Sequence, residues 1–404
     1  MRYKLKNSSN VINYFTSVYK GYGEAGASIR KKTIKSFKAQ SGSPNEDINY
    51  NNFTLRQRSR MLYMSAPIAT SAIKTNRTNV IGMGLKPKSK INLNILRKTP
   101  EQAEKWQKNA EFQFSLWAND KLACDATGIN DFYSMQQLAF TSQLMSGDSF
   151  VLIDRYKPTA MRPYSLRLRI IEADRVSTPT QLGASYAPYY TDGKASNGNK
   201  IFDGVEVNNN GLVQAYYISN KYPFESGRIS ETTKWIRVPV VGEQSQTPNI
   251  LHMMVSERPD QYRGVPYLAQ IIEPLLQMRR YTDSELMAAL VNSFFTAFIT
   301  TEQADKGIFN NNTEDVPNTI VNPDDEYVMG PGAINYLNPG ESVSFGDPKH
   351  PNSGFDKFMV VLCQLCGAAL EIPADLLMKA FNSSYSASRA ALLEAWKSFK
   401  MRRS

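Results

Sequence analysis

The chain has 404 residues, 42% of them hydrophobic, which exceeds one typical domain and suffices to build a core. No apolar run reaches the roughly eighteen residues of a membrane span and no signal-peptide core is visible, which argues against membrane insertion and export. The three cysteines make no disulfide framework and indicate folding in a reducing cytoplasm.

The net charge of +10 is concentrated near the N-terminus. Residues 1–90 carry 17 Lys and Arg against 3 Asp and Glu, whereas residues 91–404 carry 30 against 34. Residues 1–50, rich in Asn, Ser, Gly and Lys, predict a basic flexible arm. Such an arm fits either a nucleic acid or acidic partner surface, or a solubilising role without a fixed partner.

Apolar spacing predicts helices over residues 53–79, Glu101–Leu122 and Asp131–Met145, with Asp131 as the cap of the third. Gly82 and Gly84 mark a turn after the first.

After Gly147 the period changes to two, which is typical of strands. The pattern predicts strands or hairpin arms at Ser149–Ile153, Leu166–Ile170, Val205–Val207, Val213–Ile218, Trp235–Val241 and Asn249–Val255. The fold class is therefore predicted as α+β.

A long amphipathic helix is predicted from Pro274 to Thr300, which at 1.5 Å per residue would extend about 40 Å. An acidic insert follows at residues 301–353, with 9 acids, 2 Lys and short β patterns at Thr319–Val321, Tyr327–Met329 and Val343–Phe345.

A second amphipathic helix is predicted at Phe355–Glu371, ended by Pro373. A polar loop, Asn382–Ser388, then leads to a last helix, Arg389–Met401. That helix has no stop signal, so we expect the natural protein to continue.

The motifs that carry chemistry are weak. Cys363 and Cys366 form a CxxC. A functional interpretation is a redox pair or half a zinc site, and the structural alternative is two buried thiols on one helix face. No second CxxC exists in the sequence. His252, in a strand pattern, is expected to be a hydrogen-bonded structural residue. Asp324, Asp325 and Glu326 are either a divalent-ion site or a solvated turn or contact surface. No catalytic residue, metal or cofactor is predicted.

Four segments together resemble the lambda-type portal proteins of tailed bacteriophages. They are Leu55–Arg60 (an Arg-rich helix), Gly204–Val207 (a hairpin), Arg258–Pro266 (R-x-x-Q-x-R-G-x-P before the long helix) and Tyr385–Ala391 (nYSSaRaa, with Ala387 as a departure). They occur in the expected order over most of the chain.

The resemblance implies a portal fold that assembles as a ring of about twelve subunits at one capsid vertex, without enzyme activity. It implies these parts: 1–50 N-terminal arm; 51–262 α+β wing; 263–300 first stem helix; 301–353 clip; 354–372 second stem helix; 373–404 tunnel loop and helix, with the C-terminal crown absent.

The resemblance also implies partners and a location. The partners are other copies of the chain, double-stranded viral DNA, the terminase large subunit, major capsid and scaffold proteins, and head-completion or adaptor proteins, with no membrane. The location is the portal vertex of the virion, and the host cytoplasm during assembly. Asp324, Asp325 and Glu326 in the clip would be candidates for terminase and adaptor docking.

Helix dimensions fit this function. About twelve helices, each about 10–12 Å wide, make a circle of roughly 38–46 Å between axes, which leaves a lumen wider than a duplex of about 20 Å. Since rings of lysine would hold DNA too firmly to slide, few cations should line the channel. We expect Lys379, Asn382, Ser383 and Ser384 to face DNA, although Lys379 could instead pair with Asp375. Arg389 could touch phosphate, but a tie between neighbouring subunits is favoured.

Two alternatives stay open. A metal-dependent nuclease acting on phage DNA predicts Mg²⁺-dependent cleavage. A phage DNA-binding protein acting through its basic arm predicts a monomer or dimer with steeply salt-dependent binding.

Overall fold

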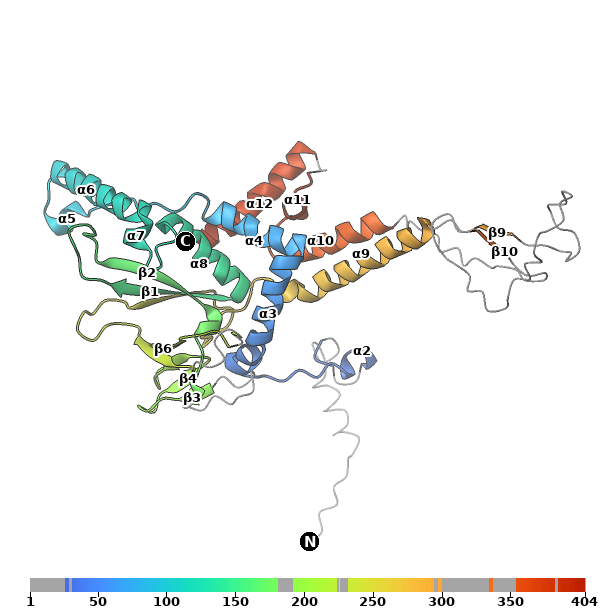
Figure 1. Cartoon of the computed structure of the whole chain (residues 1–404), viewed down its shortest axis with the longest axis horizontal. Coiled ribbons are helices and arrows are strands. Elements are labelled where there is room, and N and C mark those ends of the chain that lie inside the picture. Colours follow the sequence, from blue (N-terminus) through green and yellow to red (C-terminus); the bar gives the residue numbers. More distant parts are fainter. Residues whose placement is uncertain are drawn as a thin grey trace, which may run out of the picture.

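The computed structural model describes residues 26–28, 31–180, 192–223, 225, 232–293, 297–299, 334–336, 354–381 and 384–403 (Figure 1). Helices at both ends of this range surround a central region of strands, which confirms the predicted mixture of helix and sheet. A pair of long helices extends from the body along the longest axis of the molecule (Figure 1).

The helical segments are α2 (Lys32–Lys35), η2 (Asn45–Asn49), α3 (Tyr50–Ser65), α4 (Pro67–Val80), α5 (Leu93–Leu96), α6 (Pro100–Asn119), α7 (Lys121–Cys124), α8 (Phe132–Ser146), η3 (Ala173–Arg175), η6 (Ala269–Ile271), α9 (Ile272–Ser293), α10 (Phe355–Ala369), α11 (Ala374–Met378) and α12 (Tyr385–Arg403). The strands are β1 (Asp148–Arg155), β2 (Leu166–Glu172), β3 (Asp192–Lys194), β4 (Lys200–Phe202), β5 (Val205–Val207), β6 (Val213–Ser219), β7 (Trp235–Pro239), β8 (Ile250–Met254), β9 (Ala297–Ile299) and β10 (Ile334–Tyr336).

Two antiparallel sheets form the centre of the body. One has the strand order β2-β1-β8 and the other β3-β4-β5-β6-β7. Phe150 and Ile250 of the first sheet pack with Val205 and Tyr216 of the second in one buried cluster. Helix α8 packs against β1, so the smaller sheet lies between a helix and the larger sheet. The predicted strands of residues 149–255 are thus confirmed.

The first predicted helix is in fact two. Ala66 has an extended backbone (φ −113°, ψ 113°), and Pro67 begins α4 at a position where its missing N–H is no loss. The prediction of one continuous helix over residues 53–79 was therefore wrong at Ala66. Proline at position 67 also disfavours the helical backbone at Ala66, which is the physical reason for it.

Side-chain caps set other helix starts. The Asp131 carboxylate accepts a hydrogen bond from the Ser134 amide at the start of α8, which confirms the predicted cap. Thr99 and Gln102 form a capping box at the start of α6. The predicted helix Glu101–Leu122 is divided at Asp120, which caps the short α7.

Within the predicted first stem segment, 263–300, helix α9 runs only from Ile272 to Ser293. The prediction that the helix continues to Thr300 was wrong, because Ala297–Ile299 is strand β9, which pairs in parallel with Ile334–Tyr336. Ala297, Phe298 and Ile299 carry apolar side chains that suit a strand as well as a helix, so their spacing could not decide between the two.

Helix α10 runs antiparallel beside α9 (Figure 1), and Tyr281 of α9 stacks on Phe355 with ring centroids 5.5 Å apart. Cys363 and Cys366 lie buried as free thiols on α10, as the second reading of the CxxC predicted. Burial raises the pKa of the Cys366 thiol to about 11, which keeps it protonated and unreactive.

The last helix begins earlier than predicted. Tyr385–Ser388 is the first turn of α12 rather than loop, since the Ser388 amide donates to the Ser384 carbonyl (2.9 Å). Ser and Ala at these positions are compatible with a first helical turn, so the polar composition was misleading. The far end of α12 is anchored on α4, where Arg403 donates to the Asn79 and Val80 carbonyls.

Candidate functional site: a buried arginine junction and a projecting helix pair

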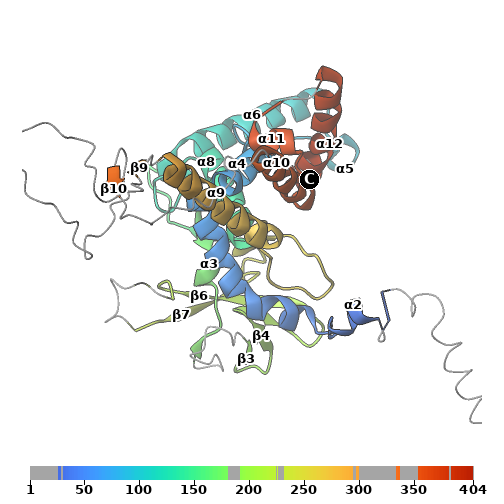
Figure 2. The same ribbon diagram turned by 90° about the vertical axis from the view of Figure 1, so that its right-hand side faces the viewer.

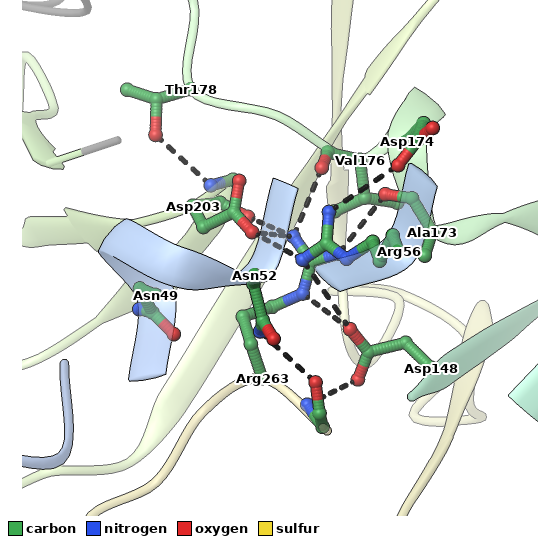
Figure 3. Close-up of polar contacts among 12 residues, drawn as sticks. Asn49, Asn52, Arg56, Asp148, Ala173, Asp174, Val176, Thr178, Asp203 and Arg263 are labelled. Atoms are coloured by element: carbon green, nitrogen blue, oxygen red, sulfur yellow. Dashed lines mark hydrogen bonds and ion pairs between the residues drawn. The ribbon is translucent and has the colours of Figure 1, made fainter. Parts of the chain in front are cut away.

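Two arginines from motifs far apart in the sequence meet beneath the start of α9. Arg56 comes from the Arg-rich helix α3, and Arg263 from the loop that precedes η6 and α9. Both are buried, with Arg263 0% exposed. They lie among the carboxylates of Asp148, Asp174 and Asp203, as Figure 3 shows. We call these five residues the arginine junction.

The junction connects both sheets with α3 and the segment before α9. Arg263 Nε donates to Asp148 Oδ2 (2.7 Å), and its two terminal nitrogens donate to the backbone carbonyls of Ala173, Val176 and Asp203. Arg56 donates to Asp203 Oδ2 (2.7 Å). Asp148 begins β1 and Asp203 lies in the turn between β4 and β5. The two sheets, α3 and the segment leading to α9 are therefore joined through two guanidinium groups.

The buried charges compensate one another. Burial alone would raise the pKa of Asp148, but the Arg263 charge and the hydrogen bond from His252 outweigh it, so the pKa is lowered. Burial alone would lower the pKa of Arg56, but Asp203 and the other carboxylates raise it. Asp148 and Arg56 therefore stay charged at neutral pH, and the junction is a structural tie rather than an acid–base site.

His252 belongs to the same network. Its Nε2 lies 2.9 Å from Asp148 Oδ1 and its Nδ1 lies 3.3 Å from the Tyr216 hydroxyl. Both ring nitrogens therefore have partners, which confirms the prediction of a hydrogen-bonded structural histidine.

Two glycine backbones cross beside the junction. Gly147 (φ +84°) ends α8, and Gly264 follows Arg263; an added Cβ on Gly264 would lie 2.0 Å from the Gly147 carbonyl oxygen. The Asn52 amide donates to the Gly264 carbonyl (3.0 Å), and the Gly264 amide donates to Asp148 (2.6 Å). Only glycine fits both positions, so the start of α9 is held tightly against the end of α8.

The α9–α10 pair exposes large apolar side chains on its outer surface. Leu276 and Met287, at i and i+11 on α9, share one face and are 39% and 60% exposed. On α10, Val361 and Leu365 are 50% and 60% exposed, and Phe358, 47% exposed, also packs edge-on against Tyr281 of α9 (4.9 Å between ring centroids). Met278, Leu362 and Cys363 fill only the inner side at the base. The pair therefore buries one face in this chain and leaves apolar surface for contact elsewhere.

The segment after α10 rests on α4. Lys379 has a left-handed backbone (φ +58°) at the end of α11, and its ammonium donates to Thr75 Oγ1 (2.8 Å). Ser71 Oγ donates to the Leu377 carbonyl (2.6 Å). Lys379, Ser384 and Arg389 are all exposed, so their predicted contact with DNA stays a prediction.

Several predicted site residues lie outside the described residues. They are Asn382, Ser383, Asp324, Asp325, Glu326 and the β patterns at 319–321, 327–329 and 343–345. Within the described ranges, no group of three or more His, Cys, Asp or Glu side chains could hold a metal ion. The same ranges contain no helix long and apolar enough to cross a membrane.

Sequence reasoning did not find the acidic half of the junction. Asp148, Asp174 and Asp203 are widely separated in the sequence, and each reads as an ordinary polar residue at the end of a strand or in a turn. The sequence pointed to the junction only through Arg56 and Arg263, which lie in two of the four segments that resemble the portal family.

The sequence matches the family described as phage portal protein, lambda family, over residues 30–403. A curated relative, a probable portal protein of Halomonas phage phiHAP-1, is 24% identical over 323 residues, covering 80% of this chain and 57% of the relative. This chain therefore spans a little over half the length of that relative. The chain belongs to the lambda family of phage portal proteins.

Two solved structures share a distant likeness. The neck of a native gene transfer agent particle, computed with C12 symmetry, gives a TM-score of 0.43 at 11% identity, covering 86% of this chain and 75% of the other. A chain of the virion of a native gene transfer agent particle gives a TM-score of 0.41 at 12% identity, covering 85% of this chain and 74% of the other.

Proposed function

We propose that this chain is the subunit of a ring at one vertex of a phage capsid, through which double-stranded DNA enters and leaves. Family membership supports a portal role. The single observation that carries the ring is the α9–α10 pair, which projects from the body (Figure 1) and exposes large apolar side chains. A projecting pair of helices with such a surface is stabilised when identical pairs pack beside it.

In this proposal, residues 51–262 form the wing, α9 and α10 are the stem, and residues 301–353 form the clip. The wing joins the stem at the arginine junction. The described stem is shorter than 263–300, because α9 ends at Ser293. The ring acts by conducting DNA and holding partners, without enzyme activity of its own.

The charges of the stem suit a conduit. Helix α9 carries Arg279 and Arg280 against Glu273, Asp283 and Glu285, and residues 354–388 carry two lysines against three acids. Arg279 and Asp283 also pair on the helix surface (4.0 Å). A near-neutral wall binds few phosphates, so a duplex can slide past without being held.

The clip would meet the terminase large subunit and later the head-completion or adaptor proteins, with Asp324, Asp325 and Glu326 as docking candidates. The wing would meet capsid and scaffold proteins. The assembled ring would reside in the virion, and its subunits would occupy the host cytoplasm during assembly.

The test of the ring is the mass of the purified protein under native conditions. We expect a closed oligomer of about twelve subunits. The double variant Met287→Glu with Leu365→Glu places a charge on each stem helix and should convert the oligomer into smaller species. Met161→Glu, at a loop residue that is 92% exposed, should leave the ring intact. A stable monomer of the unmodified chain would contradict the proposal.

A further inference from the structure

An open groove beside α4 collects positive charge from two separate parts of the chain. Helix α4 lies against α11 and α12 (Figures 1 and 2). The groove, of about 580 Å³, is lined by the end of α3, by α4 and by the residue that follows α11. Its described lining contains three cations, Lys74, Arg77 and Lys379, and no Asp or Glu. We call these three residues the α4 cations.

Cations outnumber acids around α4. Residues 48–100, which include α3 and α4, carry ten Lys and Arg and no Asp or Glu. Helix α8, which also packs on α4, contains no acid, and α12 brings Arg402 and Arg403 to the far end of α4. The acids on or beside the other helices that contact α4 are Glu371, Asp375 and Glu394. Two of these acids are already paired, Glu371 with Arg402 (3.3 Å) and Glu394 with Lys397 (2.6 Å).

Lys379 reaches the groove at the expense of backbone strain. Its backbone is left-handed (φ +58°, ψ +29°), a conformation that glycine adopts readily and that residues with a Cβ adopt with strain. Its ammonium donates to Thr75 Oγ1 (2.8 Å), which holds the charge against α4. Since an ammonium has three N–H donors, two of them remain for a ligand.

The rest of the lining indicates the class of ligand. Six Ser, Thr and Asn side chains line the groove, against three apolar side chains of which none is aromatic. The hydroxyls of Thr70 and Ser71 already donate to backbone carbonyls, so the α4 cations and the exposed Thr78 are left to meet a ligand. Protein partners are held mainly by buried aromatic and apolar anchors, whereas Lys, Arg, Ser and Thr make many of the contacts with phosphate oxygens. The groove therefore suits phosphate groups better than a protein segment.

We propose that the α4 cations bind the phosphodiester backbone of double-stranded DNA without reading its sequence. This inference deepens the proposed function and rests on it for the identity of the ligand, because the ring would bring a duplex to every copy. The near-neutral stem would let the duplex slide, and the α4 cations would retain it at one level of the channel.

The test uses the assembled full chain and the fluorescence anisotropy of a labelled duplex over a series of salt concentrations. Lys74→Gln with Arg77→Gln should weaken binding at least about tenfold and lower the slope of log affinity against log salt by at least about 1. Lys194→Gln with Lys200→Gln, at two exposed and paired positions of β3 and β4, removes the same charge elsewhere. This control should change the affinity by less than about threefold and keep the slope.

Lys379→Gly separates binding from folding. Glycine relieves the left-handed strain, so the midpoint of thermal unfolding should stay close to that of the unmodified chain. Duplex affinity should nevertheless fall at least about threefold, because a phosphate contact is lost. If Lys379 serves only to tie α11 to Thr75, the midpoint should fall and the affinity should stay unchanged.

A polyglutamate peptide tests the protein alternative and should bind at least about tenfold more weakly than the duplex. Four results would overturn the proposal: no duplex binding by the unmodified chain, equal salt slopes for the α4 and β3–β4 variants, unchanged affinity in Lys379→Gly, and binding of polyglutamate as tight as that of the duplex. The last result would assign the groove to an acidic protein segment.

The native mass of each variant keeps this proposal apart from the ring. An intact ring whose duplex binding ignores the α4 substitutions refutes the α4 site alone. A monomer whose duplex binding depends on the α4 cations refutes the ring alone.

Discussion

Arg263 is the largest fully buried side chain among the described residues, and its surroundings explain how a charge can be kept there. Its guanidinium meets two carboxylates and three backbone carbonyls, so its donors are well satisfied. A buried ion pair of this kind contributes little net stability over an apolar core, but removing one partner is costly. The junction therefore acts mainly by specifying one arrangement of α3, the sheets and the start of α9.

Arg263→Met tests this compensation. It leaves Asp148 buried without its nearest cation, and we expect a loss of about 3–5 kcal/mol in the free energy of unfolding. Arg263→Lys keeps the charge but loses the planar set of guanidinium N–H donors, so the free energy of unfolding should fall by less than in Arg263→Met. Lys397→Met, which removes an exposed pair with Glu394, should leave the urea midpoint nearly unchanged. Similar midpoints for Arg263→Met and Lys397→Met would refute the role given to the junction.

Glu206 predicts a dependence of stability on pH. Burial by itself would raise its pKa, but hydrogen bonds from Arg237, Asn197 and Asn199 lower it to about 2, from an ordinary 4.5. Because the folded pKa is the lower one, this contribution is complete above about pH 4.5 and is lost as the pH falls towards about 2.

In Glu206→Gln, the free energy of unfolding should therefore depend less on pH between about pH 5 and about pH 2.5, by up to about 1.4 kcal/mol per pH unit. Urea titrations across this range measure the slope. Glu243→Gln, at an exposed turn residue, is the control and should keep the slope of the unmodified protein.

At the scale of elements, short local signals decide where helices begin and end. Pro67 divides α3 from α4, Asp131 begins α8, and Gly147 ends it with a left-handed backbone. The crossing of Gly147 and Gly264 then converts one of these local signals into a long-range contact, because the end of α8 touches the chain just before α9.

A pair of alanine substitutions separates conformational strain from crowding. Gly147 and Gly198 have nearly equal φ values, +84° and +86°, but an added Cβ would lie 2.4 Å from the Gly264 oxygen in the first and in open space in the second. Gly198→Ala should cost about 1–2 kcal/mol from backbone strain alone. Gly147→Ala should lower the stability clearly more, and thermal unfolding of the two variants measures the difference. Equal losses of stability would mean that the Gly147 and Gly264 backbones can move apart at little cost.

At the scale of the whole molecule, the proposed ring multiplies each charge by the number of subunits. Ser384 is exposed between α11 and α12 and is predicted to face DNA. Ser384→Arg would then add a ring of about twelve positive charges to the channel.

We expect the Ser384→Arg ring to bind a short duplex more tightly and with a steeper dependence on salt. Fluorescence anisotropy of a labelled duplex over a series of salt concentrations measures both quantities. Asn209→Arg, at an exposed hairpin turn, adds the same charge elsewhere and should have a smaller effect. Equal salt slopes for the two variants would argue against a lining position for Ser384.

Much of the fold could be predicted from the sequence because its signals are local. The Asp131 cap, the apolar run of β1, the alternation in β2 and the CxxC on a buried helix face each depend on neighbours within a few residues. The break at Ala66 was also readable from Pro67. The end of α9 was not, because β9 is specified by its pairing with Ile334–Tyr336, well away in the sequence.

The candidate site was harder to predict. Arg56 and Arg263 stood out through their motifs, but no spacing rule connects them with Asp148 or Asp203, since tertiary folding alone brings these side chains together. The exposed apolar faces of α9 and α10 were readable as amphipathic patterns, yet which face would stay uncovered depended on how the two helices pack.

The attachment of α11 and α12 to α4 has a mechanical consequence. Lys379 and Leu377 are hydrogen-bonded to Thr75 and Ser71 of α4. Arg402 and Arg403 of α12 donate hydrogen bonds to later residues of α4. A pull on the turn between α11 and α12 would reach the sheets through α4 and α8 as well as through α10, which α11 also contacts. In the proposed ring, friction from passing DNA at this turn would thus be shared between the body of each subunit and its projecting helices.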